Sequence, residues 1–252
     1  MTDVPKSHPR YASLRTRNLI VEGIKKGVTS IHGLIAHGRG EAFDYLLGEK
    51  TNDFARKSIE AATAMLLMAK HPVISVNGNT VVLVAKELVE LSKISQAPLE
   101  GNIFHVSQQR ESRIKNHLIK NGAKSILMPD KKYKIKFLDS NRKYVNPHGI
   151  YKADVVFVPL EDGDRTEEEI KNGKKVITID LNPLSRTAQK ATITIVDNIV
   201  RAMPLLIEKT KEFKKYEKNE LEQIIKDYDN KAILNAAIKT TRKLWNIPQN
   251  LP

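Results

Sequence analysis

Three short runs of apolar, largely β-branched residues in the second half of the chain limit its possible folds more than any other feature. The runs are Val155–Val158, Val176–Ile179 and Ile193–Val196, and they show little alternation between apolar and polar positions. Runs of this kind are typical of strands that are buried on both faces of a parallel sheet. The sequence therefore predicts that these three segments are strands of an α/β fold.

Polar side chains follow each of these predicted strands at the point where the strand ends. The first run is followed by residues 159–165 (PLEDGDR), the second by residues 180–187 (DLNPLSRT) and the third by Asp197 and Asn198. In open α/β sheets, ligands bind outside the carboxyl ends of the strands. The repeated carboxylates, amides and arginines at these ends indicate a binding site for a multiply phosphorylated ligand.

The remainder of the chain alternates predicted strands with predicted helices. Further strands are predicted at Pro72–Val76, Ile103–Val106 and Ser125–Met128, and a helix at residues 108–120 lies between the last two. This alternation favours right-handed βαβ units and hence a Rossmann-like, mostly parallel sheet flanked by helices. Residues 130–146 are expected to form a basic, irregular excursion from that sheet.

Helical patterns also occupy both ends of the chain. One runs from about Arg10 to Lys26, and others cover residues 200–215 and 221–237 with a break near Asp229. No repeat or linker separates these segments from the α/β core. We therefore expect a single domain over residues 1–252, with a helical N-terminal segment and a helical C-terminal extension.

Composition excludes several kinds of site and of protein. The absence of cysteine excludes a thiol nucleophile, a disulfide framework and a zinc site that needs thiolates. The N-terminus lacks the apolar region of a secretory signal, and the longest compact apolar stretch, residues 61–69, is too short to span a bilayer. We therefore expect a soluble cytoplasmic protein.

The formal net charge of +13, from 42 Lys and Arg against 29 Asp and Glu, points to anionic partners. Much of this excess lies between Arg110 and Lys152. It fits an RNA-binding protein without catalytic activity as well as an enzyme for phosphorylated metabolites, and lysine-rich surfaces also occur in thermophilic proteins. The single Trp and the lack of an aromatic and basic platform for stacking bases weigh against nucleic acid.

Arg39 stands between two glycines in the stretch His37-Gly38-Arg39-Gly40, ahead of a predicted helix that starts at Glu41. Glycines on both sides would let the backbone approach a ligand closely, and the guanidinium could clamp a phosphate. The alternative is a turn with an exposed arginine. His32 and His37 are five residues apart, which is poor spacing for two metal ligands on one helix face.

The predicted strand at Pro72–Val76 runs into Asn77-Gly78-Asn79-Thr80 and then into a helical pattern. A strand, a tight turn and a helix N-terminus make an anion-binding geometry, although an ordinary capped turn has the same pattern. The segment lacks the G-x-G-x-x-G fingerprint and the Walker A lysine, which disfavours a dinucleotide-dependent oxidoreductase.

Two features of the loop after the first run concern its acidic residues. Thr166 and Glu169 have the spacing of a capping box, so Glu169 is expected to initiate a helix. Asp162 and Asp164 flank Gly163, but the other ligands of a calcium loop are missing.

The longest motifs carry a resemblance to a known family. VPLEDGDRTE from Val158, TIDLNPLSRTA from Thr178 and TIVDNIVRA from Thr194 occur in this order, and the chain also contains GLIAHGRGEAFDYLLGE from Gly33 and PVISVNGN from Pro72. Together with His8-Pro9-Arg10-Tyr11 and GIYKADVV from Gly149, they resemble the archaeal phosphopantothenate synthetase family, also called 4-phosphopantoate-β-alanine ligase. The resemblance covers roughly residues 5–205.

This resemblance implies ATP-dependent joining of 4-phosphopantoate to β-alanine in coenzyme A biosynthesis. The implied route is adenylation of the carboxylate with release of diphosphate, followed by attack of the amine, which gives 4-phosphopantothenate and AMP. Mg²⁺ would shield the triphosphate and orient its leaving group. The resemblance also implies a homodimer.

The resemblance further assigns an ATP site, which comprises Arg17, Arg39, Asp180, Leu181, Asn182, Arg186, Thr187 and Asn198. From charge and placement alone, Asn77, Asn79 and Arg165 are candidates for the organic phosphate or the acidic substrate. Glu161, Asp162 and Asp164 could support Mg²⁺ or the incoming ammonium group. The sequence assigns neither a catalytic base nor a set of metal ligands.

Overall fold

The computed structural model describes residues 4–103 and 107–246, and their centre is a five-stranded parallel sheet. The strands lie in the order β2 (Leu99–Gly101), β1 (Pro72–Val76), β5 (Val155–Phe157), β6 (Lys175–Ile179) and β7 (Ile193–Ile195). The register pairs Val73 with Val156, and Val156 with Val176. The predicted parallel α/β fold is therefore confirmed.

The sheet grows in two directions from β1. The chain passes from β1 to β2 on one side, whereas β5, β6 and β7 follow one another on the other side. The strand order therefore reverses between β1 and β5, which is where open α/β sheets form a crevice for ligands.

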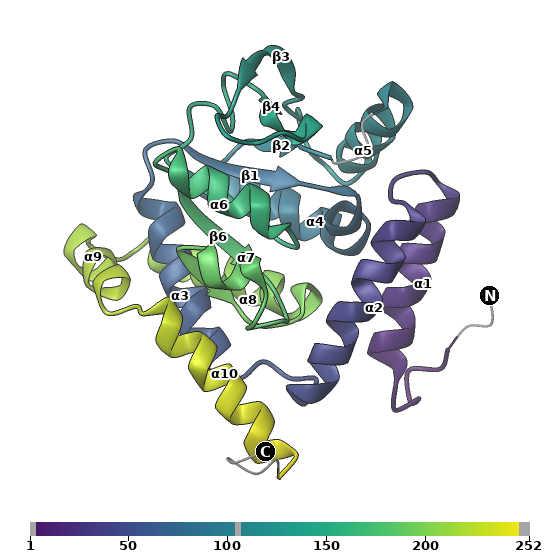
Figure 1. The fold of residues 1–252 in the computed structure, drawn as a ribbon, viewed down its shortest axis with the longest axis vertical. Coiled ribbons are helices and arrows are strands. Elements are labelled where there is room, and N and C mark those ends of the chain that lie inside the picture. Colours follow the sequence, from purple (N-terminus) through teal and green to yellow (C-terminus); the bar gives the residue numbers. More distant parts are fainter. Residues whose placement is uncertain (1–3, 104–106, 247–252) are drawn as a thin grey trace.

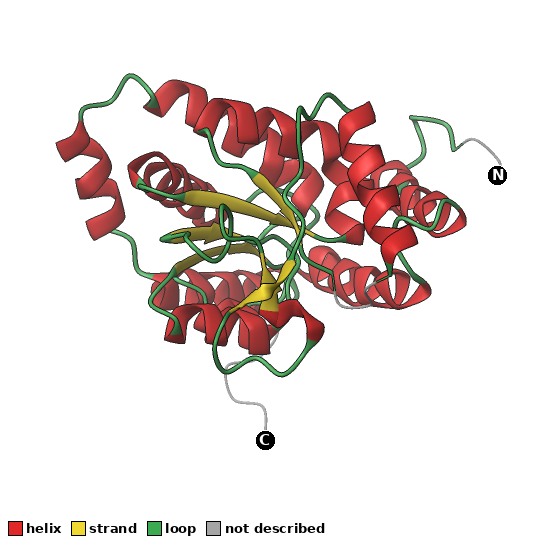
Figure 2. Cartoon of the chain, turned by 90° about the horizontal axis from the view of Figure 1, so that it is seen from above, coloured by secondary structure: helices red, strands yellow, loops and turns green. Residues whose placement is uncertain are grey.

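Helices cover both faces of the sheet (Figures 1 and 2). In chain order they are α1 (Tyr11–Lys25), α2 (Ile31–Leu46), α3 (Asp53–Met68), α4 (Gly78–Ser95), α5 (Gln108–Lys120), α6 (Gly163–Lys171), α7 (Arg186–Lys190), α8 (Ile199–Phe213), α9 (Lys218–Lys226) and α10 (Asn230–Leu244). The main core packs side chains of α3, α4 and α8 against one face, to which Ile74, Phe157 and Ile177 point. The alternate strand residues Val73, Val156 and Val176 enter a second core on the other face. Burial on both faces explains why these strands read as continuous apolar runs.

The basic segment between Asp130 and Asn146 is more regular than the sequence indicated. It contains strand β3 (Asp130–Lys134), a short 3₁₀ helix η1 (Asn141–Lys143) and strand β4 (Tyr144–Val145), and the two strands pair antiparallel. Ile135, Leu138 and Val145 are buried in the second core and attach the segment to the sheet. Lysines alternate with these apolar residues, which explains why composition alone suggested an irregular excursion.

Two of the predicted strands differ from the structure. The edge strand β2 lies at Leu99–Gly101, before the predicted segment Ile103–Val106, of which Phe104–Val106 lie outside the described residues. The prediction at Ser125–Met128 was wrong in extent, because only Leu127 forms an isolated bridge, to Glu100.

The predicted helices at both ends of the chain are confirmed. The N-terminal one is α1, and the break near Asp229 separates α9 from α10. In the part of the chain that the structure describes, no helix is long and apolar enough to cross a membrane.

Candidate active site

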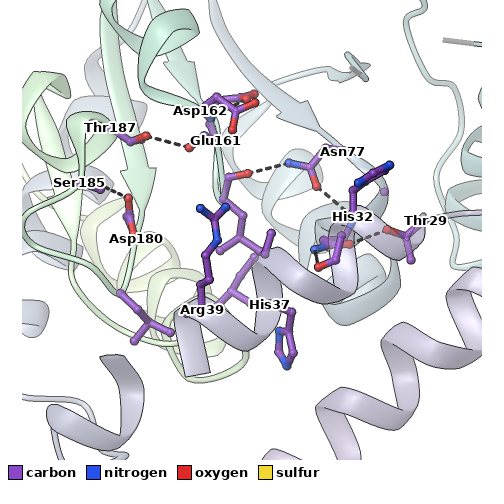
Figure 3. Close-up of a pocket in the computed structure, with 18 of the residues that line it drawn as sticks. Thr29, His32, His37, Arg39, Asn77, Glu161, Asp162, Asp180, Ser185 and Thr187 are labelled. Carbon is purple, nitrogen blue, oxygen red and sulfur yellow. Dashed lines mark hydrogen bonds between the residues drawn. The ribbon is translucent and has the colours of Figure 1, made fainter. Parts of the chain in front are cut away.

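A cavity of about 620 Å³ lies at the carboxyl ends of the strands, beside the point where the strand order reverses (Figure 3). Its volume is in the range of small-molecule sites in proteins. The wall is formed by the ends of β1, β5 and β6, the N-termini of α4 and α8, and one face of α2. The arrangement agrees with the site that the sequence predicts at the strand ends.

Asp180 anchors the part of the wall that follows β6. Its Oδ1 accepts the Asn182 N–H at 2.9 Å, and its Oδ2 accepts the Ser185 hydroxyl. Ser185 in turn caps α7 by accepting the Ala188 N–H at 2.9 Å. Burial raises the pKa of Asp180, while the bonds from Ser185 and Asn182 and the positive charge of Arg39 oppose that rise. A rigid carboxylate therefore faces a cation across the cavity.

The loop after β5 lines the cavity and is held from both sides. The Asn77 side chain donates to the Leu160 carbonyl at 3.0 Å, and the Thr187 hydroxyl donates to the Glu161 carbonyl at 2.8 Å. Leu160 has φ of 56°, in the left-handed region that a residue with a Cβ rarely adopts. These two hydrogen bonds stabilise that conformation and fix the loop.

Helix α2 forms the opposite wall and contradicts the prediction that the helix starts only at Glu41. Residues 37–40 lie within α2, whose N-cap is Ser30. The Arg39 side chain nevertheless points into the cavity, toward the space between Asp180 and Asn77 (Figure 3). Gly38 is not among the residues that line the cavity, so the predicted close approach of its backbone to a ligand in this cavity has no support. The guanidinium of Arg39 is therefore offered by a helix face.

An ionic cluster ties the C-terminal half of α2 to the end of β7. Asp44 accepts bonds from Arg201 Nη2 at 2.5 Å and Nη1 at 3.2 Å, and from Asn198 Nδ2 at 2.8 Å. Asp197 accepts from Arg201 Nη2 at 2.7 Å and from the Thr51 hydroxyl at 2.6 Å. Asn198, a predicted nucleotide residue, is thus the N-cap of α8 and a member of this cluster.

The start of α2 is tied to α4 by Asn79. Its Nδ2 donates to the Gly33 carbonyl at 2.8 Å, and its Oδ1 accepts the Thr29 hydroxyl at 2.5 Å. Asn77 caps α4 by accepting the N–H groups of Asn79 and Thr80, each at 3.1 Å. The predicted strand, turn and helix N-terminus is therefore present, and both asparagines line the cavity.

Most of the residues predicted from the sequence come together around this cavity. Those that line it are Arg39, Asn77, Asn79, Glu161, Asp162, Asp180, Leu181, Asn182, Arg186, Thr187 and Asn198. Arg186 is largely exposed at the rim and pairs with Glu167 at 2.6 Å. Arg17 and Asp164 are not among the lining residues. Arg17 lies one step back, where it donates to Glu41 at 2.7 Å, and Glu41 does line the cavity.

Arg165 was predicted as a substrate residue, but the structure places it behind the wall. It is 1% exposed and donates to Glu161 at 2.6 Å, to Ser75 at 3.1 Å and to Glu169 at 3.4 Å. The capping role predicted for Glu169 was also wrong, because α6 begins at Gly163 and Glu169 is buried in its last turn. A buried guanidinium needs such partners, which explains both positions.

Several lining residues were missed by the sequence analysis. These are Thr29, Ser30, Glu41, Arg110, Arg142 and Ser185, together with His32 and His37, which were considered only as a pair of metal ligands. Burial lowers the pKa of His37, with Arg17 acting in the same direction and Glu41 in the opposite one. Ser185 could have been found as the capping residue before Arg186. Arg110 and Arg142 stand in segments without any local motif.

The cavity does not contain a ready-made metal centre. Within residues 4–103 and 107–246, no group of three or more His, Asp or Glu side chains is placed to hold a metal ion. The carboxylates that line the cavity are Glu41, Glu161, Asp162 and Asp180. Asp162 pairs with Arg142, and in this pair the Asp162 side chain is 60% exposed whereas the Arg142 side chain is 9% exposed. Such a wall can contribute a carboxylate to a cation that is held mainly by phosphates.

Comparisons with known proteins show the family of this chain. Residues 54–244 match the family described as Phosphopantothenate/pantothenate synthetase. A 4-phosphopantoate--beta-alanine ligase of Thermococcus kodakarensis is 53% identical over 91% of this chain and 88% of its own length. One of Methanosarcina mazei is 49% identical over 94% of each chain. This chain belongs to the phosphopantothenate/pantothenate synthetase family.

Proposed function

We propose that this protein is an ATP-dependent 4-phosphopantoate-β-alanine ligase that makes 4-phosphopantothenate for coenzyme A in the cytoplasm. The observation that carries the proposal is the 49–53% identity, over about nine tenths of the chain, to proteins of that name. The cavity supports it independently, because four arginines line the wall of a site that must hold two phosphorylated substrates.

The reaction joins a carboxylate to an amine, and a carboxylate is a poor electrophile. An oxygen of the 4-phosphopantoate carboxylate attacks the α-phosphorus of ATP, and diphosphate leaves. The amine of β-alanine then attacks the carbonyl carbon of the acyl-adenylate, loses a proton, and AMP leaves with the oxygen that came from the carboxylate. The enzyme contributes chiefly by positioning the reactants and stabilising phosphate charge.

The proposed nucleotide half of the cavity lies at the ends of β6 and β7. Arg39 and Arg186 line the cavity, and we propose that they bind phosphate oxygens, since guanidinium groups form paired charge-assisted bonds with phosphate. Asp180, Leu181, Asn182, Thr187 and Asn198 shape the remaining wall. Arg17 acts through Glu41 in this proposal and does not contact the nucleotide.

Mg²⁺ in this scheme neutralises the triphosphate and aids departure of diphosphate. Among the acidic residues after β5, we propose Asp162 for its binding, because the Asp162 side chain is 60% exposed although it pairs with Arg142, whereas Glu161 is buried between Arg142 and Arg165. Mg²⁺ usually binds through one or two carboxylates and the phosphates of the substrate, so a single side chain suffices.

The test is a product assay with ATP, 4-phosphopantoate, β-alanine and Mg²⁺. We expect 4-phosphopantothenate and AMP in equal amounts, and no AMP when either organic substrate is omitted. Lack of product at every Mg²⁺ concentration would reject the assignment. RNA added at physiological salt should leave ATP binding unchanged, whereas competition by RNA would favour a nucleic-acid protein.

We further propose that the enzyme is a homodimer. One face of α2 exposes Ile31 at 63%, Ile35 at 62% and Tyr45 at 57%, and large apolar groups gathered on one helix face favour association. Light scattering across micromolar concentrations is expected to give twice the mass of the chain, and a monomer throughout would refute this.

A further inference from the structure

We infer that Arg110 and Arg142, at the side of the cavity next to β1 and β2, bind the phosphate group of the organic substrate. The inference rests on the proposed function and assigns a phosphomonoester subsite that is separate from the nucleotide half of the cavity. It extends the sequence prediction, which named Asn77, Asn79 and Arg165 as candidates for the organic phosphate or the acidic substrate and included neither Arg110 nor Arg142.

The two arginines come from different parts of the fold and meet the same cavity. Arg142 belongs to η1, in the segment between β3 and β4, and Arg110 is in the first turn of α5. Both segments lie beside the β2 edge of the sheet (Figure 1). Six of the eight predicted nucleotide residues instead follow β6 or β7, on the other side of the β5 loop, and the other two, Arg17 and Arg39, lie on α1 and α2. Arginines therefore line both ends of the cavity.

Arg142 is held rigidly at the wall. It is 8% exposed, its Nη1 pairs with the carboxylates of Glu161 and Asp162, and its carbonyl oxygen accepts from Asn102 Nδ2 at 3.1 Å. Burial lowers its pKa to about 10, and the charges of Arg165 and Arg110 act in the same direction. Glu161 is shared with Arg165, so one buried carboxylate serves two guanidinium groups. Glu161 and Asp162 together thus orient the Arg142 guanidinium at the wall.

Arg110 adds positive charge where the backbone is already electropositive. A Cβ on Gly78, the first residue of α4, would lie 3.0 Å from Arg110 Nη2, so the guanidinium lies against the N-terminus of this helix. A cation near a helix N-terminus is unfavourable, whereas an anion there is favourable. Two arginines and a helix N-terminus around one end of a cavity therefore form a site for a dianion.

The organic phosphate is the anion that fits this end. ATP takes the β6 and β7 end in the proposed function, and the remaining phosphorylated substrate is a phosphomonoester with a branched apolar carbon chain. Leu83, Ile103 and Leu160 line the same cavity and offer apolar contacts to such a chain. The planar guanidinium groups would then bind the phosphate through pairs of hydrogen bonds to its oxygens.

The test compares Arg110→Gln and Arg142→Lys with Arg113→Gln, an exposed arginine on α5 that does not line the cavity. Loss of a charge-assisted contact should raise the KM for 4-phosphopantoate roughly 10- to 100-fold in the first two variants. The KM for ATP should stay unchanged, and so should the low kcat/KM with pantoate, which lacks the phosphate. Arg113→Gln should behave as the wild type.

Three results would overturn the inference. An equal rise in the KM for ATP would place the arginines in the nucleotide site, and an unchanged KM for 4-phosphopantoate in both variants would make them structural. An equal loss with pantoate would mean that they act on another part of the substrate. Arg142→Lys changes buried ion pairs, so its folding is checked by a thermal unfolding scan. If Arg142→Lys does not fold, the result with Arg110→Gln, at a more exposed position, decides the test.

Direct binding separates this inference from the proposed function. Calorimetry with 4-phosphopantoate and no ATP should show affinity in the wild type and a roughly 10- to 100-fold loss in Arg110→Gln. If the wild type binds 4-phosphopantoate with this dependence but makes no product, the ligase proposal fails and the phosphate site stands. If it ligates without this dependence, only the phosphate site fails.

Discussion

Asp44→Asn should loosen the attachment of α2 and thereby weaken ATP binding at a distance. Asp44 is 5% exposed and accepts two bonds from Arg201 and one from Asn198. An amide in its place has no charge, and its NH₂ group would face the donors of Arg201 or Asn198. Since Arg39 lies on the same helix only five residues earlier, the perturbation reaches the cavity through the helix.

The magnitude follows from the contacts of the cluster. Breaking a buried pair by removing one partner costs about 3 to 5 kcal/mol when the other charge is left alone. Arg201 keeps Asp197 at 2.7 Å and is 26% exposed at its side chain, so a loss of about 2 to 4 kcal/mol in the free energy of unfolding is expected. For a chain of this size, that loss lowers the Tm by roughly 4 to 16 °C. Displacement of Arg39 should weaken ATP binding roughly tenfold.

The assay combines chemical denaturation with calorimetric titration of ATP. Glu222→Gln is the matched control, because it breaks a pair with Lys218 in which the side chains are 56% and 77% exposed, and such pairs contribute at most about 1 kcal/mol. If Asp44→Asn matches this control in both stability and ATP affinity, the cluster does not hold α2 and the reasoning is refuted.

Three further predictions concern the site and its support. Arg39→Lys keeps the charge but loses the planar fork, so it should weaken ATP binding roughly 10- to 100-fold, and normal binding in this variant and in Arg39→Ala would reject the phosphate role. Burial raises the pKa of Glu100 to about 7, so the folded state holds a proton that the unfolded state releases near pH 4.5. Its contribution to stability therefore falls as pH rises from about 4.5 to 7, by about 3 kcal/mol, so the unfolding free energy of the wild type should fall by this amount relative to that of Glu100→Gln, whereas a constant difference would contradict the prediction. Removal of Mg²⁺ with EDTA should stop AMP formation until Mg²⁺ is restored, and undiminished turnover in EDTA would contradict the proposed role of the cation.

The strands that could be predicted from the sequence are those whose own residues are apolar and therefore become buried. Strands β1, β5, β6 and β7 are apolar runs, and their ends carry the polar residues of the cavity. Strand β2 was missed because Glu100 stands at its centre. This carboxylate is buried by contacts that only the fold supplies, namely the N–H groups of Asn146 at 2.8 Å and Ile150 at 2.6 Å.

Local pattern was misleading at the two glycines around Arg39. Gly38 and Gly40 suggested a turn, yet tertiary contacts at both ends of α2, through Asn79 and Asp44, hold the helix across them. The weak helix propensity of glycine is a small term beside such contacts. Arg39 thus lines the cavity, as the sequence analysis expected of a site residue, but a helix presents it and not a segment before the helix.

The places of two arginines could also not be predicted from local sequence. Arg165 follows a strand in a polar loop, as a ligand residue would, but its carboxylate partners bury it behind the wall. Arg142 lies in a lysine-rich segment with no motif, and the pairing of β3 with β4 brings it to the cavity. Charge and motif are local properties, whereas the side of the wall on which a guanidinium lies depends on long-range pairing.

The most direct test of the central claim is the fate of oxygen in the ligation reaction. 4-Phosphopantoate labelled with ¹⁸O in its carboxylate is converted with ATP and β-alanine. The products are then separated, and the ¹⁸O content of each is measured by mass spectrometry. Adenylation predicts 4-phosphopantothenate together with AMP that carries a labelled oxygen, because the carboxylate oxygen that attacked phosphorus leaves with AMP. Label in inorganic phosphate with ADP as the other product, or no 4-phosphopantothenate at all, would contradict the account.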